Sequence, residues 1–196
     1  MLNKVDCIEL TNEDKIFKSL DLSEQSFVDH SFLNCTFENC TFINSLWNNA
    51  KFYSCNFVCC NISFVKVDGC FFQDVNFNEC KIVLIGFHKC NKTFFSINIK
   101  QNILLGCNFS DMSMKKSHFN KSQLKECSFT DTHLEGANFT EADLQGSIFH
   151  KCKLDKADFR GAKNYAINLQ TNSAKKTKFS YPEVMTLLQF FDIIID

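Results

Sequence analysis

The sequence predicts an all-β solenoid, a shaft of stacked coils, because its apolar residues recur with a period of five. Between Cys127 and Phe159 a Phe or Leu stands at every fifth position, a smaller residue lies two places before each, and most other residues are polar. A helix repeats its buried face every 3.6 residues and a strand every two. A strict period of five therefore requires a backbone that turns a corner once per unit. The central residues of this stretch are Phe129, Leu134, Phe139, Leu144, Phe149, Leu154 and Phe159.

The repeated unit is a small residue, a polar residue, Leu or Phe, and two more polar residues, and it resembles the motif of the pentapeptide-repeat proteins. The resemblance extends from about Leu20 to Phe159. It implies a right-handed quadrilateral parallel β-helix, in which four pentapeptides make one square turn and the central and small residues point inward. The alternation of Phe with Leu supports an even number of faces. With four faces, residues twenty apart stack, which predicts these columns: Phe109, Phe129 and Phe149; Leu104, Leu124 and Leu144; Phe119, Phe139 and Phe159.

Length and composition predict one elongated unit, since 196 residues with 45% hydrophobic content suffice for one well-cored domain. We expect an N-terminal cap over residues 1–19, a β-helix of about seven coils over residues 20–163, and a C-terminal cap with a dimerisation helix over residues 164–196. Within the shaft the register slips by two after Phe87, so the extra residues are expected in segment 88–93 and Phe94 is expected to point inward. Trp47 is expected in the core, stacked between Phe27 and Val67.

Most of the twelve cysteines occupy the small position of the repeat, where they act as small buried hydrophobes. The first ten residues lack the apolar core of a secretory leader, so we expect a cytoplasmic protein with free thiols. A zinc site built from Cys59, Cys60, Cys70 and Cys80 is the alternative interpretation, although the register already explains three of these residues. No cofactor is expected.

The tail predicts a helix from Ser180 to about Phe190, because Ser180 and Glu183 form a capping box and Pro182 falls in the first turn. Its expected apolar stripe consists of Tyr181, Val184, Leu188 and Phe191. Residues 193–195 read as a short strand.

Apolar groups in this tail exceed what one closing helix needs, and a two-fold interface would bury the surplus. We therefore expect a homodimer joined through the C-terminal helix. The expected dimer interface consists of Met185, Leu188, Phe190, Phe191 and Ile193.

Catalysis is not expected from this sequence. The five histidines are scattered, no Gly-rich phosphate loop is present, and the chain has only six glycines. Glu141 and Asp143 point outward where the motif commonly places acidic residues, so they do not indicate a catalytic pair.

Two outward features are candidates for partner binding. The stretch from Glu126 to Phe149 carries five acidic residues and no Lys or Arg: Glu126, Asp131, Glu135, Glu141 and Asp143. Glu141 is expected to stack over Lys121, and Asp131 under Lys151, so a solvated and partly paired face is the simpler interpretation. Tyr53 and Phe71 form the second candidate, on one face and one rung apart. The net charge of −1 gives no reason to expect direct nucleic-acid or membrane binding.

The helical C-terminal ending resembles that of the pentapeptide-repeat proteins that protect DNA gyrase. The resemblance implies a non-enzymatic, dimeric rod that binds gyrase or a related type II topoisomerase and relieves inhibition by quinolones or a peptide toxin, with the acidic residues as a DNA-mimicking surface. The alternative is a rigid interaction scaffold or bacterial effector without a topoisomerase role, because a fold alone does not decide function.

Overall fold

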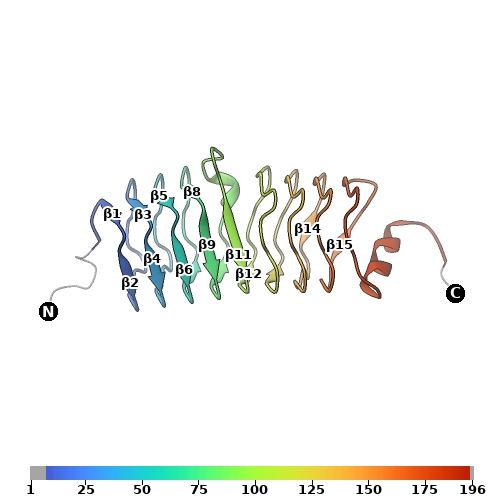
Figure 1. Cartoon of the computed structure of the whole chain (residues 1–196), viewed down its shortest axis with the longest axis horizontal. Coiled ribbons are helices and arrows are strands. Elements are labelled where there is room, and N and C mark those ends of the chain that lie inside the picture. The colour runs from blue at the N-terminus through green and yellow to red at the C-terminus, as the bar shows by residue number, and fades with distance from the viewer. Residues whose placement is uncertain (1–7, 195–196) are drawn as a thin grey trace.

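The computed structural model describes residues 8–194 and shows an elongated parallel β-solenoid with a short helix near its C-terminal end (Figure 1). Three sheets and a column of bridges form its four faces. We number them faces 1 to 4 in the order in which the chain visits them. No helix of the described residues is long and apolar enough to cross a membrane.

Face 1 is the sheet β1-β3-β5-β8, face 2 is β2-β4-β6-β9-β11 and face 3 is β7-β10-β12-β13. Face 4 is held by single bridges and by the pair β14-β15. The strands of face 1 are β1 (Thr11–Glu13), β3 (Ser31–Leu33), β5 (Lys51–Tyr53) and β8 (Phe71–Gln73); those of face 2 are β2 (Ile16–Lys18), β4 (Thr36–Glu38), β6 (Asn56–Val58), β9 (Val75–Asn78) and β11 (Ile97–Lys100). The remaining elements are β7 (Asn61–Ser63), β10 (Lys81–Val83), β12 (Ile103–Leu105), β13 (Gln123–Lys125), β14 (Ile148–Phe149), β15 (Ala166–Ile167) and the 3₁₀ helices η1 (Phe87–Lys89) and η2 (Glu183–Phe190).

The core consists of the central residues, stacked in columns as predicted. Phe119, Phe139 and Phe159 lie ring on ring with centroids 4.7 Å apart. Phe109, Phe129 and Phe149 form the second predicted column, and pairing of β12 with β13 places Leu104 beside Leu124. Trp47 is 1% exposed and lies between Phe27 and Val67, as expected.

Most corners of the coil are made by one residue in the left-handed backbone conformation, two places after the inward residue. Asn34, Glu126 and Lys156 are examples, with φ of 52°, 55° and 61°. This conformation favours Gly and Asn. It turns the chain once in every five residues, which accounts for the period of the repeat.

Face 2 defines the length of the shaft, because its inward column runs unbroken from Phe17 to Phe179. The column contains nine residues, so eight turns separate its ends, one more than the seven expected: Phe17, Phe37, Phe57, Phe77, Ile99, Phe119, Phe139, Phe159 and Phe179. The difference arises at both ends. The segment expected as an N-terminal cap contributes β1 and β2 to the first coil, and Phe179 of the expected C-terminal cap stacks on Phe159 at 5.5 Å. Phe17 stacks on Phe37 at 4.9 Å.

The register slip is real, but its position differs from the prediction. Asn91 still pairs in the twenty-residue register, whereas Ile99 pairs with Phe77, twenty-two residues earlier. The extra residues therefore lie between Asn91 and Ser96. Phe94 is 77% exposed rather than inward, and Phe95 is buried in its place. A turn at residues 93–94 lifts the backbone out of the coil, so the inward position passes to the next residue.

The tail differs from the prediction in three ways. η2 begins at Glu183 and is a 3₁₀ helix without a side-chain cap, so the capping box is wrong. Ser180 instead accepts a hydrogen bond from the Gly161 N–H at 2.8 Å. Leu187, at 5% exposed, seals the last coil, whereas Tyr181 of the expected stripe is 81% exposed. Residues 193–194 form no strand, and Ile195 lies outside the described residues.

Candidate partner-binding surfaces

The five acidic residues encircle the rod rather than gathering on one side. Glu126, Asp131 and Glu141 occupy three different corners, at φ of 55°, 53° and 59°. Glu135 lies on face 1 and Asp143 on face 3, as the bridges Ser113–His133 and Gln123–Asp143 place them. We call these five residues the acidic ring. Their spread follows from the repeat, because residues five apart lie on successive faces.

Neighbouring rungs neutralise part of the acidic ring. Glu135 pairs with Lys115 at 3.2 Å, and Glu141 pairs with Lys121 at 4.0 Å as the stacking predicted. Asp143 accepts a hydrogen bond from the Asn164 side chain at 2.8 Å. Both ion pairs are exposed, so each contributes under about 1 kcal/mol.

Two members of the ring are both exposed and without an ion pair among residues 8–194. No ion pair joins Glu126 or Asp131 to a basic side chain of the described chain, and both side chains are exposed. The expected stacking of Asp131 under Lys151 therefore does not produce an ion pair within 4.0 Å. These two are the exposed charges of the ring with which no basic side chain of the described residues forms an ion pair.

The aromatic pair lies on face 1, on neighbouring strands. β5 and β8 pair so that Lys51 lies beside Phe71 and Tyr53 beside Gln73. Tyr53 and Phe71 are thus diagonal neighbours, and both are half-buried. The structure adds Leu33, which pairs with Tyr53 and is 42% exposed.

A second apolar surface, which the sequence analysis missed, runs along the corner between faces 3 and 4. Phe64 and Leu84 occupy corner positions, at φ of 59° and 54°, and are 51% and 55% exposed. Ile103 and Leu105 of β12 continue it on face 3. A cavity of about 410 Å³ opens beside this corner, with Gly86 and Gly106 in its lining. The signal in the sequence was an apolar residue two places after a central one.

The four cysteines of the alternative zinc site do not converge. Cys59 is exposed on a corner, Cys60 and Cys80 lie together inside the shaft, and Cys70 lies inside a different corner. The described residues contain no group of three or more His, Cys, Asp or Glu arranged to hold a metal ion. Burial raises the pKa of the Cys55 thiol to about 12, and that of Cys152 to about 11. These buried thiols are protonated at neutral pH.

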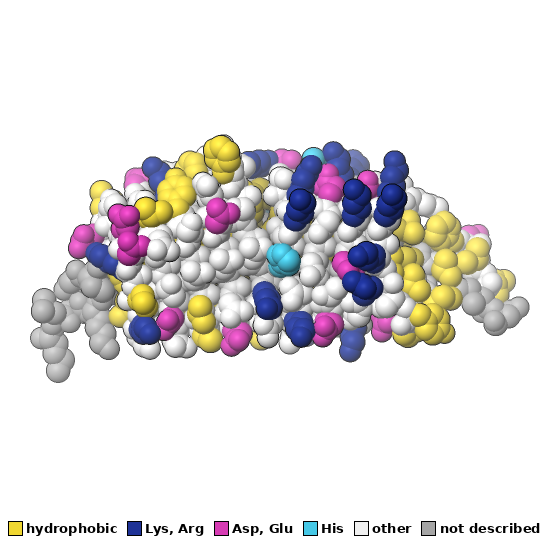
Figure 2. Space-filling view, in the orientation of Figure 1, with side chains coloured by type: hydrophobic (Ala, Val, Ile, Leu, Met, Phe, Trp, Pro, Cys, Tyr) yellow, Lys and Arg dark blue, Asp and Glu magenta, His cyan; other side chains and the backbone are white. Residues whose placement is uncertain are grey.

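The C-terminal end of the rod is apolar, as Figure 2 shows by the hydrophobic side chains gathered there. Of the expected dimer residues, Met185, Phe191 and Ile193 are 42%, 40% and 54% exposed. Leu188 and Phe190 are half-buried, and Phe190 lines a cavity of about 480 Å³ together with Ile148. Tyr181 and Ile194, at 81% and 91% exposed, extend this surface.

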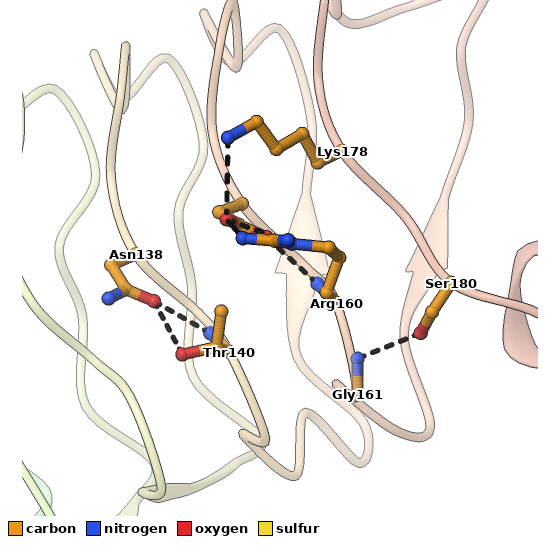
Figure 3. Close-up of polar contacts among 7 residues, drawn as sticks. Asn138, Thr140, Arg160, Gly161, Lys178 and Ser180 are labelled. Atoms are coloured by element: carbon orange, nitrogen blue, oxygen red, sulfur yellow. Dashed lines mark hydrogen bonds and ion pairs between the residues drawn. The ribbon is translucent and has the colours of Figure 1, made fainter.

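Beside the apolar end, charged side chains on face 2 are tied into one network (Figure 3). Arg160 donates to Asp158 at 2.7 Å, and Lys178 of the next rung lies 3.8 Å from the same carboxylate. The hydrogen bond from Arg160 lowers the pKa of Asp158 below its usual range. Lys178 thereby links the last two rungs of face 2 through an ion pair at the surface.

Comparison with known proteins identifies the repeat. The family model described as Pentapeptide repeat region matches residues 102–179, and that described as Pentapeptide repeats (8 copies) matches residues 31–74. No curated protein matches the sequence. Together with the square coil, these matches define a right-handed quadrilateral parallel β-helix. The chain belongs to the pentapeptide-repeat proteins.

Solved structures share this fold over most of the chain. A trypsin-treated form of QnrB1, a plasmid-mediated fluoroquinolone resistance protein, has a TM-score of 0.57 at 14% identity, over 95% of this chain and 90% of that chain. A second trypsin-treated form of QnrB1 has a TM-score of 0.54 at 15% identity, over 95% of this chain and 91% of that chain. HetL is a pentapeptide repeat protein involved in heterocyst differentiation regulation from the cyanobacterium Nostoc. Its structure has a TM-score of 0.53 at 12% sequence identity, over 85% of this chain and 84% of that chain. At these identities the likeness is one of fold.

Proposed function

We propose that this protein is a non-enzymatic rod that binds DNA gyrase or a related type II topoisomerase and relieves its inhibition by quinolones or a peptide toxin. The observation that carries the proposal is the shared architecture with QnrB1 over 95% of the chain. The apolar C-terminal end, suited to joining two rods, supports it.

The acidic ring is the surface that we assign to the partner. Because the acidic side chains encircle the rod, only a partner that surrounds the rod can contact all of them at once. The wall of a channel that normally holds duplex DNA is such a partner. Glu126 and Asp131, the exposed members without an ion pair, are the ring residues whose loss should matter most. Tyr53 and Phe71 lie in the other half of the rod and form a second contact.

A gyrase supercoiling assay with and without ciprofloxacin tests the proposal. The intact chain should restore supercoiling in the presence of the drug, in proportion to its concentration. A control protein of similar charge should not. Supercoiling that is indifferent to the chain, with and without the drug, would refute the topoisomerase role.

The second candidate function is a rigid interaction scaffold. The specific observation in its favour is the exposed apolar corner at Phe64 and Leu84, because left-handed corner positions favour Asn or Gly. Exposed apolar surface is typical of protein interaction sites. The intact chain should then capture a partner protein that the double variant Phe64→Asn/Leu84→Asn no longer captures. Such a result, together with no effect of the intact chain on gyrase, would favour this function.

A further inference from the structure

Positive and negative charges are distributed unequally along the rod, although the net charge of the whole chain is only −1. Residues 1–91 carry 7 Lys and Arg against 11 Asp and Glu, whereas residues 92–196 carry 14 against 11. The surplus of positive charge therefore belongs to the C-terminal half. Figure 2 shows Lys and Arg side chains gathered over the last coils of the rod.

Much of this positive charge follows the corner between faces 1 and 2. Lys116, Gly136, Lys156 and Lys176 occupy successive rungs of this corner, because each corner N–H bonds to the residue before the next corner: Lys116 to Glu135, Gly136 to Asp155 and Lys156 to Lys175. At one strand spacing per rung, Lys116 and Lys176 lie about 14 Å apart along the rod.

Three further lysines, Lys115, Lys153 and Lys175, lie next to this column on face 1. We call the six lysines the basic corner. All six are exposed. Glu135 and Asp155 lie among them and leave a net charge of +4.

Most of the basic corner has no acidic partner in the described chain. Only Lys115 forms an ion pair, with Glu135. Asp155 accepts hydrogen bonds from the Ser173 hydroxyl and from the Lys175 N–H at 2.8 Å, and it forms no ion pair within 4.0 Å. Five of the six ammonium groups therefore have no ion pair in the described chain.

The neighbouring surface supplies hydrogen-bond donors and little apolar area. Face 2 begins beside the corner with a groove of about 510 Å³ that contains Asn98, Lys100, His118, Asn120 and Asn138 in its lining. After residue 105, the large exposed apolar side chains of the described chain lie on or beside face 4, at Ile148 and Leu169, or at the C-terminal end, and none lies along faces 1 and 2 beside the lysines. A membrane-binding patch would need such groups beside its lysines.

We propose that the basic corner binds the phosphate backbone of duplex nucleic acid. Lysines in a straight row meet the regular negative charge of a phosphodiester strand, and Asn and His side chains make the hydrogen bonds typical of phosphate and sugar contacts. The corner carries no exposed aromatic residue on which unpaired bases could stack. The surface therefore fits duplex rather than single-stranded nucleic acid, and we expect the binding to be independent of base sequence.

A titration of a fluorescein-labelled 20-base-pair DNA duplex with the intact chain, followed by fluorescence anisotropy, tests this proposal. Contacts with three or four phosphates predict that log K falls against log salt with a slope of roughly −3 to −4. The triple variant K116E/K156E/K176E should lose at least ten-fold in affinity at 50 mM salt. Circular dichroism should show that the variant is folded.

The matched control is K51E/K66E/K81E, which makes the same charge change at exposed, unpaired lysines in the other half of the rod. It should bind the duplex within about three-fold of the parent chain. Equal weakening in both variants, or no binding at 50 mM salt, would overturn the proposal. Tighter binding to phosphatidylglycerol vesicles or to a poly-glutamate peptide would also overturn it. The assay contains no gyrase, so its outcome is independent of the proposed function.

Discussion

At the scale of the residue, the fold depends on large apolar side chains that stack along the shaft. Phe139 has its neighbours Phe119 and Phe159 at 4.7 Å on either side and is fully buried. Its replacement by Ala leaves a cavity that the fixed coil cannot close. We expect Phe139→Ala to lower the free energy of unfolding by about 3–5 kcal/mol, measured by chemical denaturation.

Phe94→Ala is the matched control for this substitution. It removes the same atoms from a side chain that is 77% exposed. It should change stability by less than about 0.5 kcal/mol. Similar losses in the two variants would show that the inward register is wrong.

Cysteine reactivity tests the same register by chemistry. Burial keeps the Cys55 thiol protonated, with its pKa raised to about 12, whereas Cys59 is exposed at a corner. In a Cys7→Ser background, iodoacetamide at pH 8 should therefore modify Cys59 alone in the folded protein. Mass spectrometry of digested protein reads the site. Rapid modification of Cys55 without denaturant would contradict its inward position.

The sequence predicted the inward residues well because the period of five is a direct record of packing. Phe139 and Trp47 could be placed from spacing alone. Phe94 could not, since an insertion breaks the spacing, and the choice between Phe94 and Phe95 depends on how the extra turn leaves the coil. The surfaces were also harder to predict, because an outward residue in one repeat says little about its neighbours a full coil away. The five acidic residues could be named from the sequence, but their spread around the rod follows from the coil, and the basic corner appears only when residues twenty apart are placed side by side.

At the scale of the element, the corner is the unit that the repeat must satisfy. Leu84 turns a corner at φ of 54°, a conformation that costs an ordinary L-residue about 1–2 kcal/mol and Asn less. Because its side chain is 55% exposed, little packing is lost on substitution. We expect Leu84→Asn to raise the free energy of unfolding by up to about 1 kcal/mol. A loss of more than 1 kcal/mol would show that Leu84 packs as a core residue.

The C-terminal element was predicted in outline but not in detail. The sequence indicated a helix after Pro182, and η2 follows it directly. Val184 of the expected stripe packs against the core, but the assumed period of 3.6 also placed Tyr181 inward and missed Leu187. A 3₁₀ helix repeats every three residues, so Leu187 follows Val184 on the inward side.

At the scale of the whole molecule, the apolar C-terminal end predicts a dimer. Met185 and Ile193 lie on this end and are 42% and 54% exposed. A two-fold interface would bury both residues on each of the two chains. Light scattering on the intact chain should give the mass of a dimer. The variant M185E/I193E should give a monomer.

I103E/L105E is the control for the dimer, since Ile103 and Leu105 are comparably exposed, at 47% and 40%, but lie in the middle of face 3. This variant should remain a dimer. A monomer from the intact chain, or dissociation of both variants alike, would exclude the C-terminal interface.

The central claim is that the rod binds gyrase through its acidic ring, and the affinity of a fluorescently labelled chain for purified DNA gyrase tests it most directly. E126K/D131K reverses the two exposed charges of the ring that have no ion pair. The control E24K/D29K makes the same change at the same two corners in the first coils. The account predicts that the parent chain binds, that E126K/D131K binds at least ten-fold more weakly, and that E24K/D29K matches the parent. No binding by the parent chain, or equal affinity of the two variants, would contradict it.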